Sequence, residues 1–168
     1  MHKFLALRLL VLISACSSTP VHTAHAKHQA EHGRQADAAH DSDADMNDVV
    51  VYALSLSDTP YHYGGNTPET GFDCSGFVRH VFKHTLGMSL PRTSHEMSRL
   101  GEAEKSTRLQ PGDLVFYNTM HQSYSHVGIY LGDGKFVHSP RSGSSVRVES
   151  MNEDYWLERY NGARRLRP

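Results

Sequence analysis

The sequence predicts an α+β domain in which N-terminal helices pack on an antiparallel sheet of about five short strands. Apolar residues recur at helical spacing in the first half of this domain and change to strand-like runs after about residue 110. Turn signals such as Pro111-Gly112 separate the later runs. The 168 residues are about one domain long, and they contain no visible internal repeat.

The first 15 residues have the pattern of an export signal. Lys3 and Arg8 supply positive charge, a short apolar run follows over 9–13, and the segment ends in Ile-Ser-Ala-Cys at Cys16. This run is too short for a transmembrane helix, which needs about 20 apolar residues. The ending resembles the lipobox of bacterial lipoproteins, which implies that residues 1–15 are removed and that Cys16 is acylated. Plain secretion with cleavage further on is the alternative.

Ser17 resembles the residue that follows the acylated Cys in lipoproteins sorted to the outer membrane. We therefore expect a lipid anchor in the outer membrane, with the protein facing the periplasm. Residues 16–45 contain no aromatic side chain and cannot bury a core, which predicts a flexible tether. About 30 such residues span roughly 30 Å. Four of its histidines could bind a transition metal or simply gain charge below neutral pH: His22, His25, His28 and His32.

The folded domain, residues 46–168, is predicted to open with a helix that begins near Asp45 and ends before Pro60. A turn-rich loop follows over 61–71. The next helix is predicted to start at Asp73, because an Asp there can cap it, and to stop at Gly87. One face of this helix carries its core-facing side chains: Cys74, Phe77, Val78, Val81 and Phe82.

Cys74 is the candidate nucleophile. If Cys16 carries lipid, Cys74 is the only thiol left and has no intramolecular disulfide partner. A thiol at a helix N-terminus lies near unpaired N–H groups and the positive end of the helix dipole, so we expect its pKa to be lowered. A buried, inert cysteine is the alternative.

A short helix is predicted after Leu90, with Ser94 as its cap, and strands are predicted beyond it. The strands cover 113–117, 126–131, 135–138, 146–148 and 163–166. Tyr155, Trp156 and Tyr160 are interpreted as a C-terminal cover for the core.

The hairpin between His126 and His138 can be tested by its register. A two-residue turn at Asp133-Gly134 would pair Ile129 with His138 and place the two imidazoles on opposite faces of the sheet. A three-residue loop over 132–134, with Gly134 left-handed, places Gly128 opposite His138 and both rings on one face. We predict the three-residue loop.

This arrangement would allow nucleophilic catalysis on an amide. Cys74 attacks the carbonyl, His126 holds the thiol proton and passes it to the leaving amine, and His138 orients His126. The backbone N–H of Cys74 and the hydroxyl of Tyr61 are candidate oxyanion donors. A zinc site at Cys74, His126 and His138 is the alternative, but the sequence has no HExxH motif or paired Cys spacing. We therefore expect no metal and no cofactor.

The formal net charge of −1 argues against nucleic acid as a partner, because nucleic-acid binding calls for a clustered basic excess.

Six segments resemble the NlpC family of bacterial cell-wall cysteine peptidases in order and in context. They are Pro60-Tyr61-His62-Tyr63-Gly64-Gly65, Gly71-Phe72-Asp73-Cys74-Ser75-Gly76-Phe77, 90–94, 109–115, 125–130 and 136–138. The resemblance implies a papain-like fold, with Cys74 as nucleophile, His126 as base and His138 as the third polar residue. It also implies that Tyr61, Asp73 and Ser75 line the site.

The resemblance further implies a peptidoglycan endopeptidase that acts on stem peptides. We expect the protein to be a monomer. The D-alanyl–diaminopimelate crosslink is the expected bond, and the bond between D-γ-glutamate and diaminopimelate is the alternative. A non-catalytic wall-binding lipoprotein and an acyltransferase on the same fold also remain open.

Overall fold

The computed structural model describes residues 45–167. The predicted signal peptide, Cys16 and the tether lie outside these residues, except for Asp45, which is already helical. The first helix covers 45–55, and it is followed by the short ribbon β1 (Asn66–Thr67) and β2 (Gly71–Phe72). Helices α2 (Cys74–Leu86) and α3 (Ser94–Met97) come next. Within the described residues no helix is long and apolar enough to cross a membrane.

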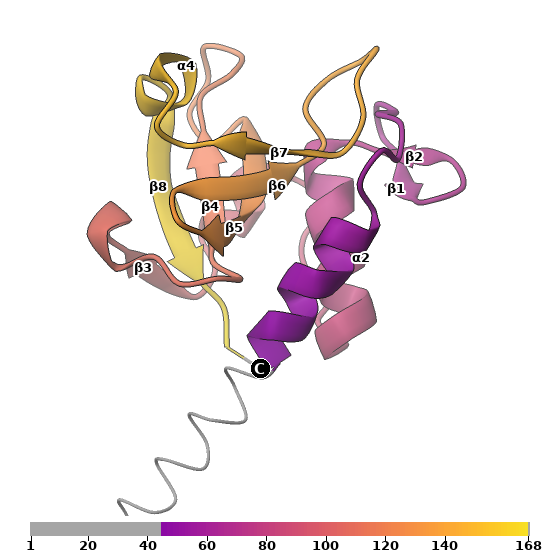
Figure 1. Ribbon diagram of the computed structural model, residues 1–168, viewed down its shortest axis with the longest axis horizontal. Coiled ribbons are helices and arrows are strands. Elements are labelled where there is room, and N and C mark those ends of the chain that lie inside the picture. The colour runs from indigo at the N-terminus through magenta and orange to yellow at the C-terminus, as the bar shows by residue number, and fades with distance from the viewer. Residues whose placement is uncertain (1–44, 168) are drawn as a thin grey trace, which may run out of the picture. The chain divides into compact units, whose positions relative to one another are not determined.

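A six-stranded antiparallel sheet forms the rest of the domain, in the order β3-β8-β4-β5-β6-β7 (Figure 1). Its strands are β3 (Glu102–Glu104), β4 (Leu114–Tyr117), β5 (His126–Gly132), β6 (Lys135–His138), β7 (Arg147–Ser150) and β8 (Tyr160–Arg165). The 3₁₀ turn η1 (Ser106–Arg108) follows β3, and the short helix α4 (Asp154–Leu157) precedes β8. The prediction of about five strands missed β3, whose exposed, charged residues give no strand pattern.

The predicted boundaries of α2 are confirmed. The carboxylate of Asp73 accepts a hydrogen bond from the backbone N–H of Gly76 at 2.7 Å, and Gly87 ends the helix with a left-handed φ of 66°. The cap of α3 is Thr93 rather than the predicted Ser94. Thr93 and Glu96 form a reciprocal capping box, which satisfies two N–H groups where Ser94 could satisfy one.

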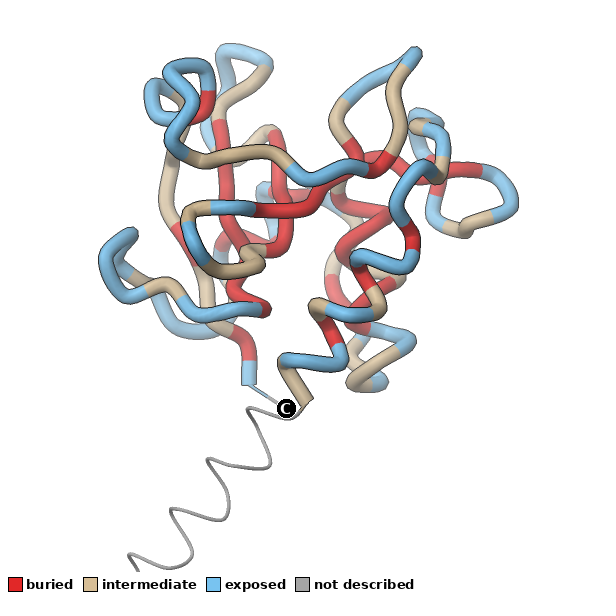
Figure 2. The backbone as a smooth tube through the Cα atoms, in the orientation of Figure 1, coloured by how far each residue is buried: buried red, intermediate tan, exposed pale blue. Residues whose placement is uncertain are grey.

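The main core lies between the helices and one face of the sheet. Alternate residues of the strands face the helices, and Figure 2 shows buried backbone concentrated where the two layers meet. Among them are Val127, Ile129 and Val137, which pack with Phe77 and Phe82 of α2. The other face of the sheet carries a smaller cluster that includes Tyr117, Phe136 and Trp156. By the same alternation His126 and His138 lie on this second face.

The β5–β6 hairpin has the predicted register but not the predicted loop. Ile129 pairs with Val137, so Gly128 lies opposite His138 as expected. The turn itself has two residues, Asp133 and Gly134, both with positive φ. The extra residue is Leu131, which bulges between Tyr130 and Gly132. A bulge shifts the register by one residue, as a three-residue loop would have done, so both imidazoles share one face.

Candidate active site

The structure brings Cys74, His126 and His138 together where α2 and β5 begin. Cys74 is partly buried at the first position of α2, and its thiol lies near the backbone of Val127 and of Ser75. His126 begins β5, directly before Val127. Both Cys74 and His126 line a cavity of about 630 Å³. The sulfur therefore reaches the histidine face of the sheet around the end of β5.

The two imidazoles form one rigid pair. His126 Nε2 lies 2.7 Å from His138 Nδ1, and the ring planes meet at 89°. His126 is 3% exposed and His138 is fully buried. Gly128 leaves the space for this pair, since a Cβ there would lie 2.7 Å from a ring carbon of Phe136 and 3.2 Å from Cβ of His138. The prediction that the rings share one face is confirmed.

Trp156 holds the imidazole pair in place from the outside. Its ring stacks on His126 at 5.8 Å and meets His138 edge-on at 5.1 Å between centroids. The predicted C-terminal cover for the core is thus also the packing partner of both histidines. Because Nε2 of His126 contacts Nδ1 of His138, only Nδ1 of His126 is left to face the cavity.

Glu149 is a member of the site that the sequence analysis did not identify. Its Oε2 lies 3.2 Å from His138 Nε2, at ion-pair distance but without the alignment of a good hydrogen bond. Arg147 binds the same carboxylate through its Nε at 2.6 Å. His138 and Arg147 are direct partners in the β6–β7 pairing, so Glu149 lies two residues along the same face. The predicted strand ended at residue 148; its extension by one residue would have placed Arg147 and Glu149 on one face and was the signal that could have revealed Glu149.

The charges around the pair favour neutral imidazoles. Burial lowers the pKa of His126 well below its ordinary value, and the neighbouring His138 lowers it further. Burial also lowers the pKa of His138, although the Glu149 carboxylate opposes this effect. The contact with His138 lowers the pKa of Glu149 to about 2, so this carboxylate is ionised at neutral pH.

The thiol differs from the sequence-based expectation. Burial raises the pKa of Cys74 to about 11, and the Asp73 carboxylate adds to this effect. The backbone of Val127 in β5 and that of Ser75 at the helix start oppose the rise but are weaker than desolvation. The expected lowering of the pKa is therefore wrong for the free protein, because burial of the sulfur outweighs the effect of the helix start and the Asp73 charge adds to it.

Asp73 and Ser75 line the cavity, but Arg92 already binds both side chains. Its guanidinium donates to the two carboxylate oxygens of Asp73, at 3.1 and 2.5 Å, and to the Ser75 hydroxyl at 2.8 Å. Burial would raise the pKa of Asp73, but the hydrogen bonds from Arg92 and from Gly76 bring it below its ordinary value. Arg92 is a second member that the sequence analysis assigned no role, since nothing in the local sequence indicates its partner.

Tyr61 lines the same cavity as Cys74 and Arg92. Its backbone N–H donates to Ser144, and burial together with the nearby Cys74 raises the pKa of its hydroxyl. Within residues 45–167 no group of three or more His, Cys, Asp or Glu side chains is arranged to hold a metal ion.

Comparison with known proteins identifies the domain. The model of the NlpC/P60 family matches residues 58–165, which is well over half of the chain. The chain belongs to the NlpC/P60 family. As a member of NlpC/P60, it has solved structural relatives that include a family protein from Bacillus cereus. That structure has a TM-score of 0.68 and 38% identity, with 73% of this chain and 40% of the other covered.

Two curated relatives of this NlpC/P60 chain differ in the bond that their names specify. Murein DD-endopeptidase MepH of Escherichia coli is 46% identical over 110 residues, with 64% of this chain and 41% of the relative covered. Gamma-DL-glutamyl hydrolase of Bacillus subtilis is 40% identical over 135 residues, with 80% and 32% covered. The chain therefore spans less than half the length of these two relatives.

Proposed function

We propose that this protein is a peptidoglycan endopeptidase that hydrolyses stem-peptide amides by a cysteine mechanism. The observation that carries the proposal is the buried imidazole pair, 2.7 Å apart, beside the only cysteine of the NlpC/P60 domain. The name of MepH supports the D-alanyl–diaminopimelate crosslink as the bond. The name of gamma-DL-glutamyl hydrolase favours the second candidate, the bond between D-γ-glutamate and diaminopimelate.

In the proposed reaction the thiol is deprotonated as it attacks, because the resting thiol and imidazoles are neutral. His126 takes the proton at Nδ1, since its Nε2 is engaged with His138. The carbon–sulfur bond forms, and the carbon–nitrogen bond then breaks as His126 gives the proton to the leaving amine. Water attacks the resulting thioester, releasing the carboxylate product and the thiol.

Two further groups take part in this proposal. The N–H of Cys74 lies in the first turn of α2, where N–H groups have no helical acceptor, and it would stabilise the oxyanion together with Tyr61. Glu149 acts as a positioning residue, because its negative charge favours the imidazolium that forms on His126. The Glu149 carboxylate contacts His138, and the other ring nitrogen of His138 contacts His126, so the His138 ring connects the two.

The anchoring of the protein is part of the same proposal. A lipid on Cys16 would hold a monomeric domain at the outer membrane and leave it within reach of the peptidoglycan in the periplasm. The support for this is the Ile-Ser-Ala-Cys ending and the polar residues that follow it.

Incubation of the purified protein with muropeptides, followed by mass analysis of the products, tests the function. We expect crosslinked dimers to be converted to monomers, and we expect Cys74→Ala to reduce the rate by about a thousand-fold or more. Release of fragments cut after D-γ-glutamate would favour the second candidate. Unchanged cleavage by the Cys74→Ala protein would exclude the mechanism, and no cleavage by the wild type would favour a wall-binding role.

A further inference from the structure

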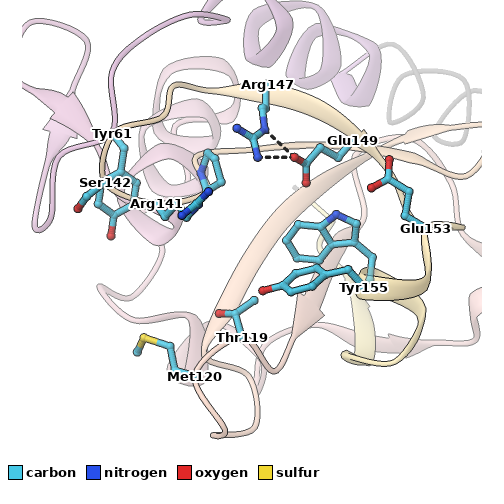
Figure 3. A pocket seen from close by; sticks show the side chains of 11 residues that line it. Tyr61, Thr119, Met120, Arg141, Ser142, Arg147, Glu149, Glu153 and Tyr155 are labelled. Atoms are coloured by element: carbon cyan, nitrogen blue, oxygen red, sulfur yellow. Dashed lines mark hydrogen bonds and ion pairs between the residues drawn. The ribbon is translucent and has the colours of Figure 1, made fainter.

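A second cavity, of about 750 Å³, adjoins the one that contains Cys74 (Figure 3). The two cavities share four lining residues: Tyr61, Thr119, Met120 and Pro140. The second cavity extends from this shared wall along the loop after β6 and along β7 to α4. Neither Cys74 nor Arg92 lines it, so it is a separate extension of the same groove.

The second cavity lies on the histidine side of the nucleophile. Its lining includes Trp156, which stacks on His126, and Glu149, which contacts His138. The first cavity contains His126 itself and extends from there toward Asp73 and Arg92. In the proposed reaction His126 gives its proton to the leaving nitrogen, so that nitrogen must lie beside the imidazole. The second cavity is therefore where the leaving amino acid fits.

One cation in this cavity is free to bind a ligand. Arg147 is neutralised by Glu149 within the cavity wall, as the dashed contacts in Figure 3 show. Arg141 is exposed and has no carboxylate within ion-pair distance among residues 45–167. Glu153, the other unpaired charge of the lining in the described part of the chain, lies across the cavity from Arg141 (Figure 3).

The position of Arg141 fits an anion close to the scissile bond. Arg141 directly follows Pro140, which lines both cavities, so the cation is one residue from their boundary. In a D-alanyl–diaminopimelate crosslink the carbon that bears the leaving nitrogen also bears a free carboxylate. A guanidinium can bind a carboxylate through two parallel hydrogen bonds. At the D-γ-glutamyl bond the equivalent carbon carries an amide whenever the stem continues.

We propose that Arg141 binds the free carboxylate of the leaving amino acid in the second cavity and so selects crosslinks in which this carboxylate is unmodified. The inference rests on the proposed function, and it makes Arg141 a specificity residue for the bond that is cut. Arg141 is exposed before substrate binds and makes no ion pair in the described residues, so its replacement leaves the fold intact.

Two muropeptide dimers that differ only at this group test the inference. In one the leaving centre has a carboxylate, and in the other it has a carboxamide. We expect the wild type to cleave the carboxylate dimer with a kcat/KM about 10- to 100-fold higher, as for one charge-assisted contact. Arg141→Gln should lose this preference by slowing only on the carboxylate dimer, and Arg141→Lys should retain part of it. Arg99→Gln, at an exposed arginine that lines neither cavity, should match the wild type on both dimers.

The outcomes separate this inference from the proposed function. If the wild type cleaves both dimers equally, or Arg141→Gln slows equally on both, Arg141 does not read the carboxylate, although the endopeptidase stands. If the wild type cleaves neither, the proposed function itself fails. If Arg141→Gln is inactive on both, binding of the two dimers is compared by calorimetry in Cys74→Ala proteins with and without Arg141→Gln. Equal loss of affinity for both dimers would then overturn the inference.

Discussion

At the scale of single residues, Glu149 connects the histidine pair to the surrounding charges. Its carboxylate raises the pKa of both imidazoles, whereas Arg147 lowers that of His138. The two residues therefore act on the base in opposite directions, although each contacts the other. If Glu149 and Arg147 act through their charges, replacing one or the other should shift the pH profile in opposite directions, which a merely structural role of either residue would not do.

Replacing Glu149 by Gln should move the pH profile. Without the negative charge the pKa of His126 falls further, so the acid limb of kcat/KM shifts to lower pH. The imidazolium formed during the reaction also loses its partner, and the rate should fall by about tenfold, which corresponds to roughly 1.4 kcal/mol. Initial rates between pH 4 and pH 8 on one muropeptide measure both effects.

The matched control is Arg147→Gln, for which the acid limb should move to higher pH because a cation beside His138 is removed. Shifts of both variants in the same direction, or a lower rate with no shift in either, would contradict the electrostatic role of Glu149.

Cys74 illustrates how one residue can have two opposed effects. Asp73 is needed to start α2 and thus to place the sulfur at the helix N-terminus. Its charge nevertheless raises the pKa of the thiol, and burial raises it more. In the proposed reaction the helix start therefore positions the sulfur and supplies an oxyanion donor, while His126 supplies the deprotonation.

At the scale of elements, the contact between α2 and the segment that leads into the β1–β2 ribbon determines where the sulfur of Cys74 lies. Gly76, in the first turn of α2, packs so closely that a Cβ there would be 2.0 Å from the carbonyl oxygen of Gly65. The N–H of Asp73 also donates to this oxygen, so the ribbon and the helix cap share one contact. A bulkier residue at 76 must move the backbone that carries Cys74.

Gly76→Ala should destabilise the protein even though alanine favours helices. Helix propensity would add about 1 kcal/mol of stability, but overpacking against a backbone group typically costs about 1–3 kcal/mol. Urea unfolding should show a lower midpoint, and cleavage should be slower in the folded fraction because the sulfur is displaced. Lys83→Ala, on the exposed side of the same helix, should leave both nearly unchanged. A stabilised Gly76→Ala protein would show that the helix and the ribbon are not in rigid contact.

The β5–β6 hairpin shows which part of an element the local sequence determines. Gly128 and Gly134 pointed to the right register, because a facing ring needs room and the turn needs a left-handed residue. They did not distinguish a longer loop from a tight turn with a bulge at Leu131, since either one shifts the pairing by one residue.

At the scale of the whole molecule, two neutral histidines within the fold make its stability depend on pH. The pKa values of His126 and His138 are lowered in the folded state, so at pH below about 6.5 the unfolded chain takes up protons that the native protein does not. Each such histidine lowers the free energy of unfolding by up to about 1.4 kcal/mol per pH unit as the pH falls. Glu149, with its pKa lowered to about 2, adds a loss that begins below about pH 4.5.

Urea unfolding at pH 7, 6 and 5 should therefore show a steady loss of stability. A His126→Gln, His138→Gln protein should be less stable at pH 7 but should lose less between pH 7 and pH 5. An equal loss in both proteins would mean that other groups cause the acid sensitivity.

The sequence by itself determined the class of the fold, the limits of α2, the shared face of the two histidines and the chemical identity of the candidate site. These features depend on neighbours a few residues apart, such as Asp73 with Gly76 or His126 with Gly128, where capping and strand alternation leave few choices. Only the tertiary structure decided that Arg92 binds Asp73, that Glu149 reaches His138 and that the thiol is neutral at rest. Each of these depends on groups that packing brings together from distant parts of the sequence and on the water excluded around them. The spacing of residues along a short segment predicts neither the distance between such groups nor the loss of their hydration.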